Sequence, residues 1–225
     1  MNVGIIGAGN IGLNLARQWS KRGHDVFLSF KRNPTELESL AAEIGTRWGT
    51  PAEAAAHGEA VLLAVPWVAL DEVATVIDVN GKVLIDATNP FVSGGLASLP
   101  DGLGAGPANS ARFSGSRLVK AFNTNTSRFQ ARVGDGDENG PVAMFLSGAD
   151  ADAKQLVAML IRDAGFEPVD LGGPREMVLM EAPRRGGAVF GEAYRPEDAR
   201  TVAAAATDDL TKAARLASTL KLPDA

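Results

Sequence analysis

The chain has 225 residues, of which 45% are hydrophobic and 22% charged, and its formal net charge at pH 7 is -5. This composition is ordinary for a globular protein, and the length allows one large domain with a smaller appendage. The acidic balance, without a basic run, argues against nucleic acid as a partner. The longest central apolar run, residues 60–70, is shorter than the roughly 20 residues that cross a bilayer, so we expect no membrane span. Because the sequence has no cysteine and no signal-peptide pattern, we expect a cytoplasmic protein.

A glycine-rich turn follows the first apolar run. Residues 3–6 read VGII and residues 7–12 read GAGNIG. In a dinucleotide-binding turn, Gly7 would allow the sharp turn out of the strand, Gly9 would let the backbone approach a pyrophosphate, and Gly12 would let the next helix pack closely on the sheet. The phosphates then lie on free N–H groups of the helix. We therefore predict a nucleotide-binding turn that includes Asn10 and Ile11, with a purely structural glycine turn as the alternative.

Apolar runs alternate with helical patterns along the chain, which predicts an α/β fold with a Rossmann-type, doubly wound, mostly parallel sheet. The expected strands are Val3–Ile6, Asp25–Ser29, Ala60–Val65, Lys82–Asp86, Leu118–Phe122, Val142–Ser147 and Glu167–Asp170. The expected helices are Ile11–Arg22, Pro34–Ile44, Leu70–Ile77 and Ala151–Ala164, with Ile11, Leu15 and Trp19 forming the buried stripe of the first.

Two stretches do not fit this alternation of strands and helices. Residues 90–116 are rich in Gly, Pro and Ser and follow the end of a strand, where ligands of α/β proteins bind. Residues 172–196 are also irregular and precede an alanine-rich helix that we expect from Glu197 to Leu220. We predict a nucleotide-binding domain over residues 1–171 and a smaller helical segment over residues 172–225.

The end of the second expected strand indicates which nucleotide binds. An acidic residue at this place binds the ribose 2′-hydroxyl of NAD, but the chain has the hydroxyl of Ser29 followed by Lys31 and Arg32. Arg32 can hold a 2′-phosphate with two N–H groups, and Lys31 adds a positive charge. The sequence therefore favours NADP over NAD. The alternative is that both cations are solvated loop residues.

Several motifs in order resemble the deazaflavin (coenzyme F-420)-dependent NADP oxidoreductases, a family that is itself similar to the cytoplasmic NADPH-binding domains of membrane metalloreductases. The resemblance covers most of residues 1–171. It implies an NADPH-binding reductase that passes hydride to a ring held over the nicotinamide. The cofactor would be NADP(H), with coenzyme F-420 or a flavin as the second substrate. The motifs are IIGAGNIG at 5–12, GHD at 23–25, Ser29 with Lys31-Arg32, VPW at 65–67, DATNP at 86–90 and KAFNT at 120–124.

The resemblance also implies roles for individual residues. The 2′-phosphate site would include Ser29, Lys31 and Arg32. Beside the cofactor would lie Val65, Pro66 and Trp67, and near its nicotinamide Asn89 and Pro90. Asn123 would also belong to the cofactor-binding residues. For Trp67 a packing role is the alternative, and for Asn123 a role in capping a helix. After Gly172 the chain departs from the family, in a region that forms part of the acceptor site and of the subunit contacts there. A homodimer is therefore an assembly to test.

A reductase of carbonyls or imines needs a proton donor near the reacting atom, and the chain offers few. Lys120 lies in an apolar strand, where we expect it either to be a positioning residue at the strand end or to reach solvent, and no dyad is evident. Tyr194 lies in the irregular C-terminal part, and we expect His24 and His57 at the surface. Hydride transfer to a flavin-like ring needs no such acid, because the cofactor supplies the chemistry. We therefore assign no catalytic residue, and without cysteine we expect no metal site.

We conclude that the sequence favours an NADPH-dependent oxidoreductase with a deazaflavin or flavin acceptor. One alternative is a small imine or ketone reductase that uses Tyr194 or Lys120 as the proton donor. Another is a non-catalytic NADPH-binding redox sensor. Four arginines, at positions 112, 117, 184 and 185, are candidates to bind the phosphate and acidic tail of coenzyme F-420.

Overall fold

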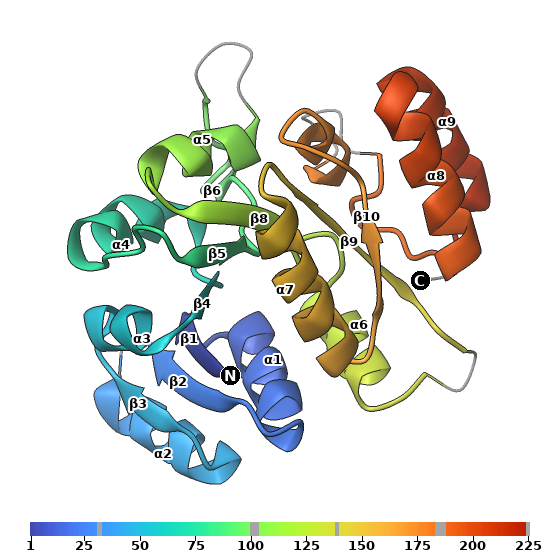
Figure 1. The fold of residues 1–225 in the computed structure, drawn as a ribbon. Coiled ribbons are helices and arrows are strands. Elements are labelled where there is room, and N and C mark those ends of the chain that lie inside the picture. Colours follow the sequence, from blue (N-terminus) through green and yellow to red (C-terminus); the bar gives the residue numbers. More distant parts are fainter. Residues whose placement is uncertain (31–32, 100–103, 138–139, 183–187, 224–225) are drawn as a thin grey trace.

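The computed structural model describes residues 1–30, 33–99, 104–137, 140–182 and 188–223. These residues fold around an eight-stranded sheet with the order β10-β9-β8-β5-β4-β1-β2-β3 (Figure 1). The strands from β3 to β8 in this order run parallel, whereas β9 and β10 run in the opposite direction. The predicted Rossmann-type, mostly parallel α/β fold is confirmed. The strands are β1 (Asn2–Ile6), β2 (Asp25–Ser29), β3 (Arg47–Gly49), β4 (Ala60–Leu63), β5 (Val83–Asp86), β8 (Arg117–Ala121), β9 (Ala143–Gly148) and β10 (Glu167–Asp170).

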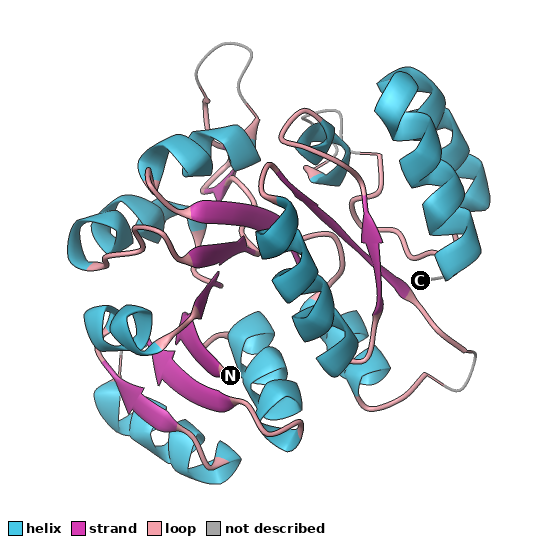
Figure 2. Ribbon diagram, viewed as in Figure 1, coloured by secondary structure: helices cyan, strands magenta, loops and turns pink. Residues whose placement is uncertain are grey.

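Helices cover both faces of the sheet (Figure 2). The helices α1, α2 and α7 pack on one face of the sheet, and α3, α4 and α5 pack on the other. Successive side chains of a strand point to opposite faces, so strands such as β1 and β4 contribute to the hydrophobic clusters on both faces. The long helices α8 and α9 pack together and cover β9 and β10. The helices are α1 (Asn10–Lys21), α2 (Pro34–Ile44), α3 (Pro51–His57), α4 (Leu70–Val76), α5 (Ala105–Arg112), α6 (Ser127–Gly134), α7 (Ala151–Asp163), α8 (Pro196–Asp208) and α9 (Leu210–Leu220), with short turns η1 (Trp67–Ala69) and η2 (Glu176–Met180) and a hairpin of β6 (Phe91–Val92) and β7 (Gly95–Leu96).

The predicted stripe of α1 anchors this helix in the core. Leu15 and Trp19 are buried, and Ile11 is half-buried. The indole N–H of Trp19 donates to the carbonyl of Leu160 in α7 at 2.8 Å. Its ring meets Phe122 edge to face, with centroids 6.0 Å apart. The position of α1, and with it the glycine turn at its start, is therefore fixed by contacts to both neighbouring elements.

Several elements were not predicted. The supposed irregular stretch 90–116 contains the hairpin and α5, whose Pro107 lies in the first turn, where a missing N–H costs no helical hydrogen bond. The short β3, α3 and α6 were also missed, although Thr50 and Glu53 form a capping box at the start of α3. The expected single helix from Glu197 to Leu220 is two helices, because Asp209 has extended backbone angles and caps α9. The division of the chain at residues 171 and 172 stays a prediction.

Arg117 was a candidate to bind an acidic ligand, and the structure pairs it inside the protein. Its guanidinium donates two hydrogen bonds to Asp150, at 2.8 and 2.7 Å. Asp150 also caps α7 by accepting from the N–H of Ala153 at 2.8 Å. The Arg117 guanidinium holds the pKa of the Asp150 carboxyl well below its usual range. The pair ties β8 to the start of α7.

This depressed pKa predicts a pH-dependent contribution to stability. The pair stabilises the fold above the ordinary carboxyl pKa of about 4, and this contribution is lost as the pH falls through the lower folded-state pKa. Asp150→Asn keeps the capping oxygen but removes the charge. We expect the variant to be less stable than the wild type at pH 7 and the difference to shrink below about pH 4. Urea unfolding at several pH values measures it, with Asp152→Asn as a control for the same charge change in the same helical turn. A difference that is constant from pH 7 to pH 2 would contradict the prediction.

Candidate functional site

The three glycines of the turn between β1 and α1 differ in the space that a side chain would find there. Gly7 has a φ of +122°, and a Cβ there would lie 2.4 Å from the carbonyl oxygen of Ala64. A Cβ at Gly12 would lie 1.9 Å from the carbonyl oxygen of Gly7. At Gly9, by contrast, a Cβ would meet nothing within 4 Å. Gly7 and Gly12 are therefore required by the protein's own packing, whereas Gly9 leaves open space in front of the helix.

That open space belongs to a groove of about 790 Å³ at the carboxyl ends of β1 and β4. Gly9, the N-cap of α1, lines the groove and provides no side-chain hydrogen bond to the helix. The first N–H groups of a helix have no partner within the helix, so they attract an anion. Asn10 is exposed and Ile11 half-buried in this turn. The groove is lined by Gly7, Ala8, Gly9, Phe30, Glu36, Ala64, Val65, Pro66, Val68, Ala69 and Glu72.

The end of β2, where we expected a 2′-phosphate, is described only in part. Ser29 is fully buried, and its hydroxyl donates to the carbonyl of Ile5 at 3.0 Å. In this arrangement the hydroxyl joins β2 to β1 and is not turned to the groove. Phe30, with a φ of 58°, follows it and lines the groove. Lys31 and Arg32 lie outside the described residues.

The residues after β4 form the opposite wall. Val65 is buried and Pro66 exposed, and both line the groove. Trp67 is 7% exposed and packs in the core below, with the guanidinium carbon of Arg112 5.0 Å from its ring centroid. Arg112 also donates to Asp71 at 2.7 Å. Arg112 is thus held by packing and an ion pair, as Arg117 is by Asp150; Arg184 and Arg185 lie outside the described residues.

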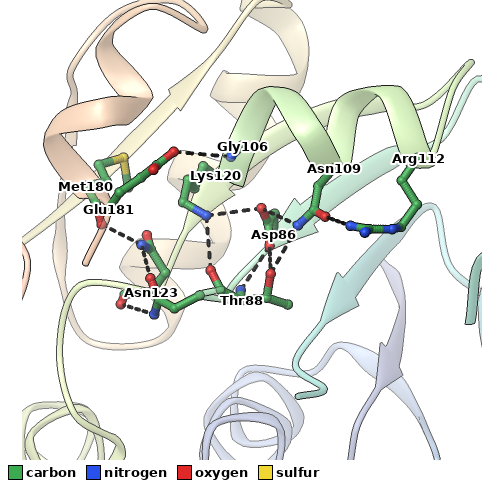
Figure 3. A network of polar contacts seen from close by, with 10 residues as sticks. Asp86, Thr88, Gly106, Asn109, Arg112, Lys120, Asn123, Met180 and Glu181 are labelled. Atoms are coloured by element: carbon green, nitrogen blue, oxygen red, sulfur yellow. Dashed lines mark hydrogen bonds and ion pairs between the residues drawn. The ribbon is translucent and has the colours of Figure 1, made fainter. Parts of the chain in front are cut away.

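Asn89, predicted near the nicotinamide, and Asn123, predicted to bind the cofactor, lie side by side after the ends of β5 and β8. The Asn89 amide donates to the backbone carbonyl of Asn123 at 2.9 Å, and the Asn123 amide donates back to Asn89 Oδ1 at 3.2 Å. Asn123 also donates to the carbonyl of Met180 at 2.7 Å (Figure 3). Pro90 is buried next to them. The structure therefore joins two distant motifs, and it adds η2 of the C-terminal part to the same end of the sheet.

Beneath this pair lies a charged cluster that the sequence analysis missed. Asp86 and Lys120 are fully buried and form an ion pair of 3.1 Å (Figure 3). Asn109 of α5, also fully buried, donates to Asp86 at 3.1 Å. Of the two alternatives for Lys120, the one in which it reaches solvent is wrong, and the expectation that it forms no dyad is wrong as well. The signal was present, because two apolar strands carry opposite charges at positions that are partners in the parallel register.

The other candidate proton donors are also enclosed. Tyr194 is fully buried and donates its hydroxyl to the carbonyl of Ala217 at 3.0 Å, and burial raises its pKa. We expected both histidines at the surface, but their side chains are mostly buried. The side chain of His24 is 8% exposed and that of His57 is 11% exposed. His24 contacts Asp163 at 2.9 Å. None of these three residues lines the groove.

Within the described part of the chain, no helix has the length and apolar character to span a membrane. The described side chains of His, Asp and Glu likewise form no group of three or more that could hold a metal ion.

Comparisons with known proteins agree with this geometry. Residues 2–90 match the model of the family described as NADP oxidoreductase, coenzyme F420-dependent. Over 171 residues, 76% of the chain, the sequence is 28% identical to metalloreductase STEAP3 of Rattus norvegicus. The chain spans about a third of that relative's length, 33%.

Solved structures extend the similarity to most of the fold. A hypothetical protein from Sinorhizobium meliloti has a TM-score of 0.75 and 28% identity, and the match covers 86% of this chain and 94% of that one. A candidate F420-dependent NADP-reductase from Arthrobacter sp. FB24 has a TM-score of 0.67 and 25% identity, over 85% of this chain and 97% of that one. The resemblance inferred from the sequence motifs is confirmed.

Proposed function

We propose that the protein is an oxidoreductase that transfers hydride between NADP(H) and a deazaflavin or flavin, since residues 2–90 match the model of the coenzyme F420-dependent NADP oxidoreductase family. The observation that carries this proposal is the glycine turn, in which Gly9 alone of the three leaves room for a ligand. This supports a pyrophosphate at the turn, because Gly9 is the N-cap of α1 and lines a wide groove, and the first N–H groups of a helix attract an anion.

In this proposal different residues bind different parts of NADP(H). Gly9, Asn10 and Ile11 hold the pyrophosphate through their backbone. The region after β2 holds the adenosine 2′-phosphate, with Lys31 and Arg32 as its cations and Ser29 fixing the strand behind them. Val65 and Pro66 form the facing wall, while Trp67 supports it from the core, and Asn89, Pro90 and Asn123 lie towards the nicotinamide. The bound cofactor supplies the hydride, and the protein supplies orientation.

The groups available for proton transfer favour a flavin-like acceptor. Reduction of an imine or ketone needs an acid within hydrogen-bond reach of the substrate. Tyr194 is enclosed in the C-terminal core, and the Nζ atom of Lys120 is fully buried and already donates to two acceptors. A flavin or deazaflavin makes no such demand, because its own ring accepts the hydride.

The test is oxidation of NADPH, followed at 340 nm, with coenzyme F-420, FMN or a cyclic imine as the acceptor. Turnover with F-420 or FMN supports the proposal. Turnover with the imine alone would favour a reductase with a proton donor outside the described residues. Tight NADPH binding without turnover of any acceptor would indicate a redox sensor.

The preference for NADP over NAD rests on the two cations after β2. Arg32→Glu places a carboxylate against the 2′-phosphate, and we expect it to weaken NADPH binding by about 2–3 kcal/mol, the range for hydrogen bonds to charged groups. NADH, which lacks this phosphate, should bind nearly as before. Fluorescence titration of both nucleotides measures the difference, with Arg47→Glu as the control because Arg47 lies on β3 and pairs with Asp25. Equal losses for both nucleotides would show that Arg32 does not contact the phosphate.

A further inference from the structure

The buried cluster under the Asn89–Asn123 pair converges on one residue, Thr88. The carboxylate of Asp86 accepts the backbone N–H of Thr88 at 2.9 Å and its hydroxyl at 2.7 Å. Asn109 donates to the same hydroxyl oxygen at 3.1 Å. Lys120 donates to the backbone carbonyl of Thr88 at 3.0 Å (Figure 3). The N–H, hydroxyl and carbonyl of Thr88 are therefore all held by buried side chains.

The residue that follows Thr88 is Asn89, which the proposed function places near the nicotinamide. The carbonyl that Lys120 holds belongs to the peptide bond between Thr88 and Asn89. The orientation of that peptide determines where the Asn89 side chain begins. Asn89 is then tied to Asn123 by two hydrogen bonds, so a shift of the peptide would be transmitted to both amides.

Stability alone does not explain the cluster. A buried ion pair seldom stabilises a fold more than well-packed apolar residues of similar volume, because removing both charges from water is costly. The neighbouring positions of β5 and β8 are filled by such apolar residues, among them Ile85 and Val119. The hydrogen bonds of Asp86, Asn109 and Lys120 to Thr88 instead specify one position for this residue.

We propose that Lys120 is a positioning residue, which acts with Asp86 and Asn109 to hold the Thr88–Asn89 peptide and so to set Asn89 and Asn123 against the nicotinamide. Lys120 itself does not touch the cofactor, since its side chain is fully buried. The inference rests on the proposed binding of NADP(H). It assigns to the buried charges a function in the geometry of hydride transfer and none in proton transfer.

The experiment measures binding of the two halves of the nucleotide separately. 2′,5′-ADP reports binding of the adenosine half, and the fluorescence of bound NADPH reports the surroundings of the dihydronicotinamide. Thr88→Val keeps the shape of the side chain and loses the hydroxyl, while Thr88→Ser keeps the hydroxyl. We expect Thr88→Val and Lys120→Met to weaken NADPH binding about three- to tenfold, as for one buried hydrogen bond, and to change the emission of bound NADPH. Binding of 2′,5′-ADP should stay as in the wild type, and Thr88→Ser should restore both properties.

Tyr194→Phe is the matched control for loss of a buried hydrogen bond elsewhere, because it removes only the bond to Ala217 and a weaker one to Ala188. It should leave the ratio of the two affinities unchanged. If Lys120→Met does not fold, the comparison of Thr88→Val with Thr88→Ser decides alone. Equal effects on NADPH and 2′,5′-ADP, or no effect on either, would overturn the positioning role. A wild-type protein that binds 2′,5′-ADP but not NADPH would do the same, and one that binds neither would overturn the proposed function with it.

Discussion

Replacing Gly9 by valine is expected to abolish nucleotide binding while the protein stays folded. The added side chain enters the open space in front of α1, where it would keep a pyrophosphate from the helix N–H groups. Loss of roughly two hydrogen bonds to a charged group corresponds to a decrease in affinity of at least about 100-fold. Within the protein the new Cβ meets nothing within 4 Å, and the backbone φ of -89° is accessible to valine. The remaining cost is a poorer N-cap residue, about 1 kcal/mol or less.

The same turn supplies the control. Gly12→Ala adds a smaller group, but its Cβ would lie 1.9 Å from the backbone of Gly7. This variant should lose thermal stability, whereas Gly9→Val should melt close to the wild type. NADPH titration and thermal unfolding of both variants give the comparison. If Gly9→Val retained micromolar affinity for NADPH, the turn would be structural and no pyrophosphate would lie there.

Local signals explain why the turn and most strands could be predicted. The spacing of the glycines within one strand-turn-helix unit predicts the turn, although the contact that requires Gly7 is with Ala64 after β4. The strands β2 and β10 begin and end where the apolar pattern places them. The short β3 and α3 were not predicted, because a three-residue strand and a seven-residue helix show little hydrophobic periodicity. In α5, Gly106 and Pro107 conceal the helix, because both are poor helix formers in its interior yet are tolerated in the first turn.

The contacts in the candidate site between residues far apart in the chain could not be predicted from local sequence patterns. Val65 and Pro66 were placed by resemblance, and the structure puts them on the wall of the groove. The contact of Asn123 with Met180 joins residues 57 positions apart, and no local pattern predicts it. Ser29 looked like a ligand because a hydroxyl next to two cations suits a phosphate. Its fully buried position follows from the pairing of β2 with β1, which a single strand does not reveal.

Lys120→Met is expected to lower the free energy of unfolding strongly, by about 3–5 kcal/mol, because it leaves Asp86 charged, buried and without its cation. Asp86→Leu should be damaging for the same reason, since it leaves the ammonium group of Lys120 enclosed. The double variant removes both charges and should lose less than the sum of the two single losses. Its loss will not vanish, because Thr88 and Asn109 also donate to Asp86 and would lose their acceptor.

The measurement is a double-mutant cycle by urea unfolding at pH 7. For residues in direct contact the coupling energy is about 0.5–3 kcal/mol, and we expect the upper half of that range because neither side chain is exposed. Arg17 and Glu43 form a surface pair of 3.0 Å and are the matched control. Their coupling should be at most about 1 kcal/mol, because solvent screens exposed charges. Additive losses at Lys120 and Asp86 would contradict this prediction, because they would mean that the two charges do not interact in the folded protein.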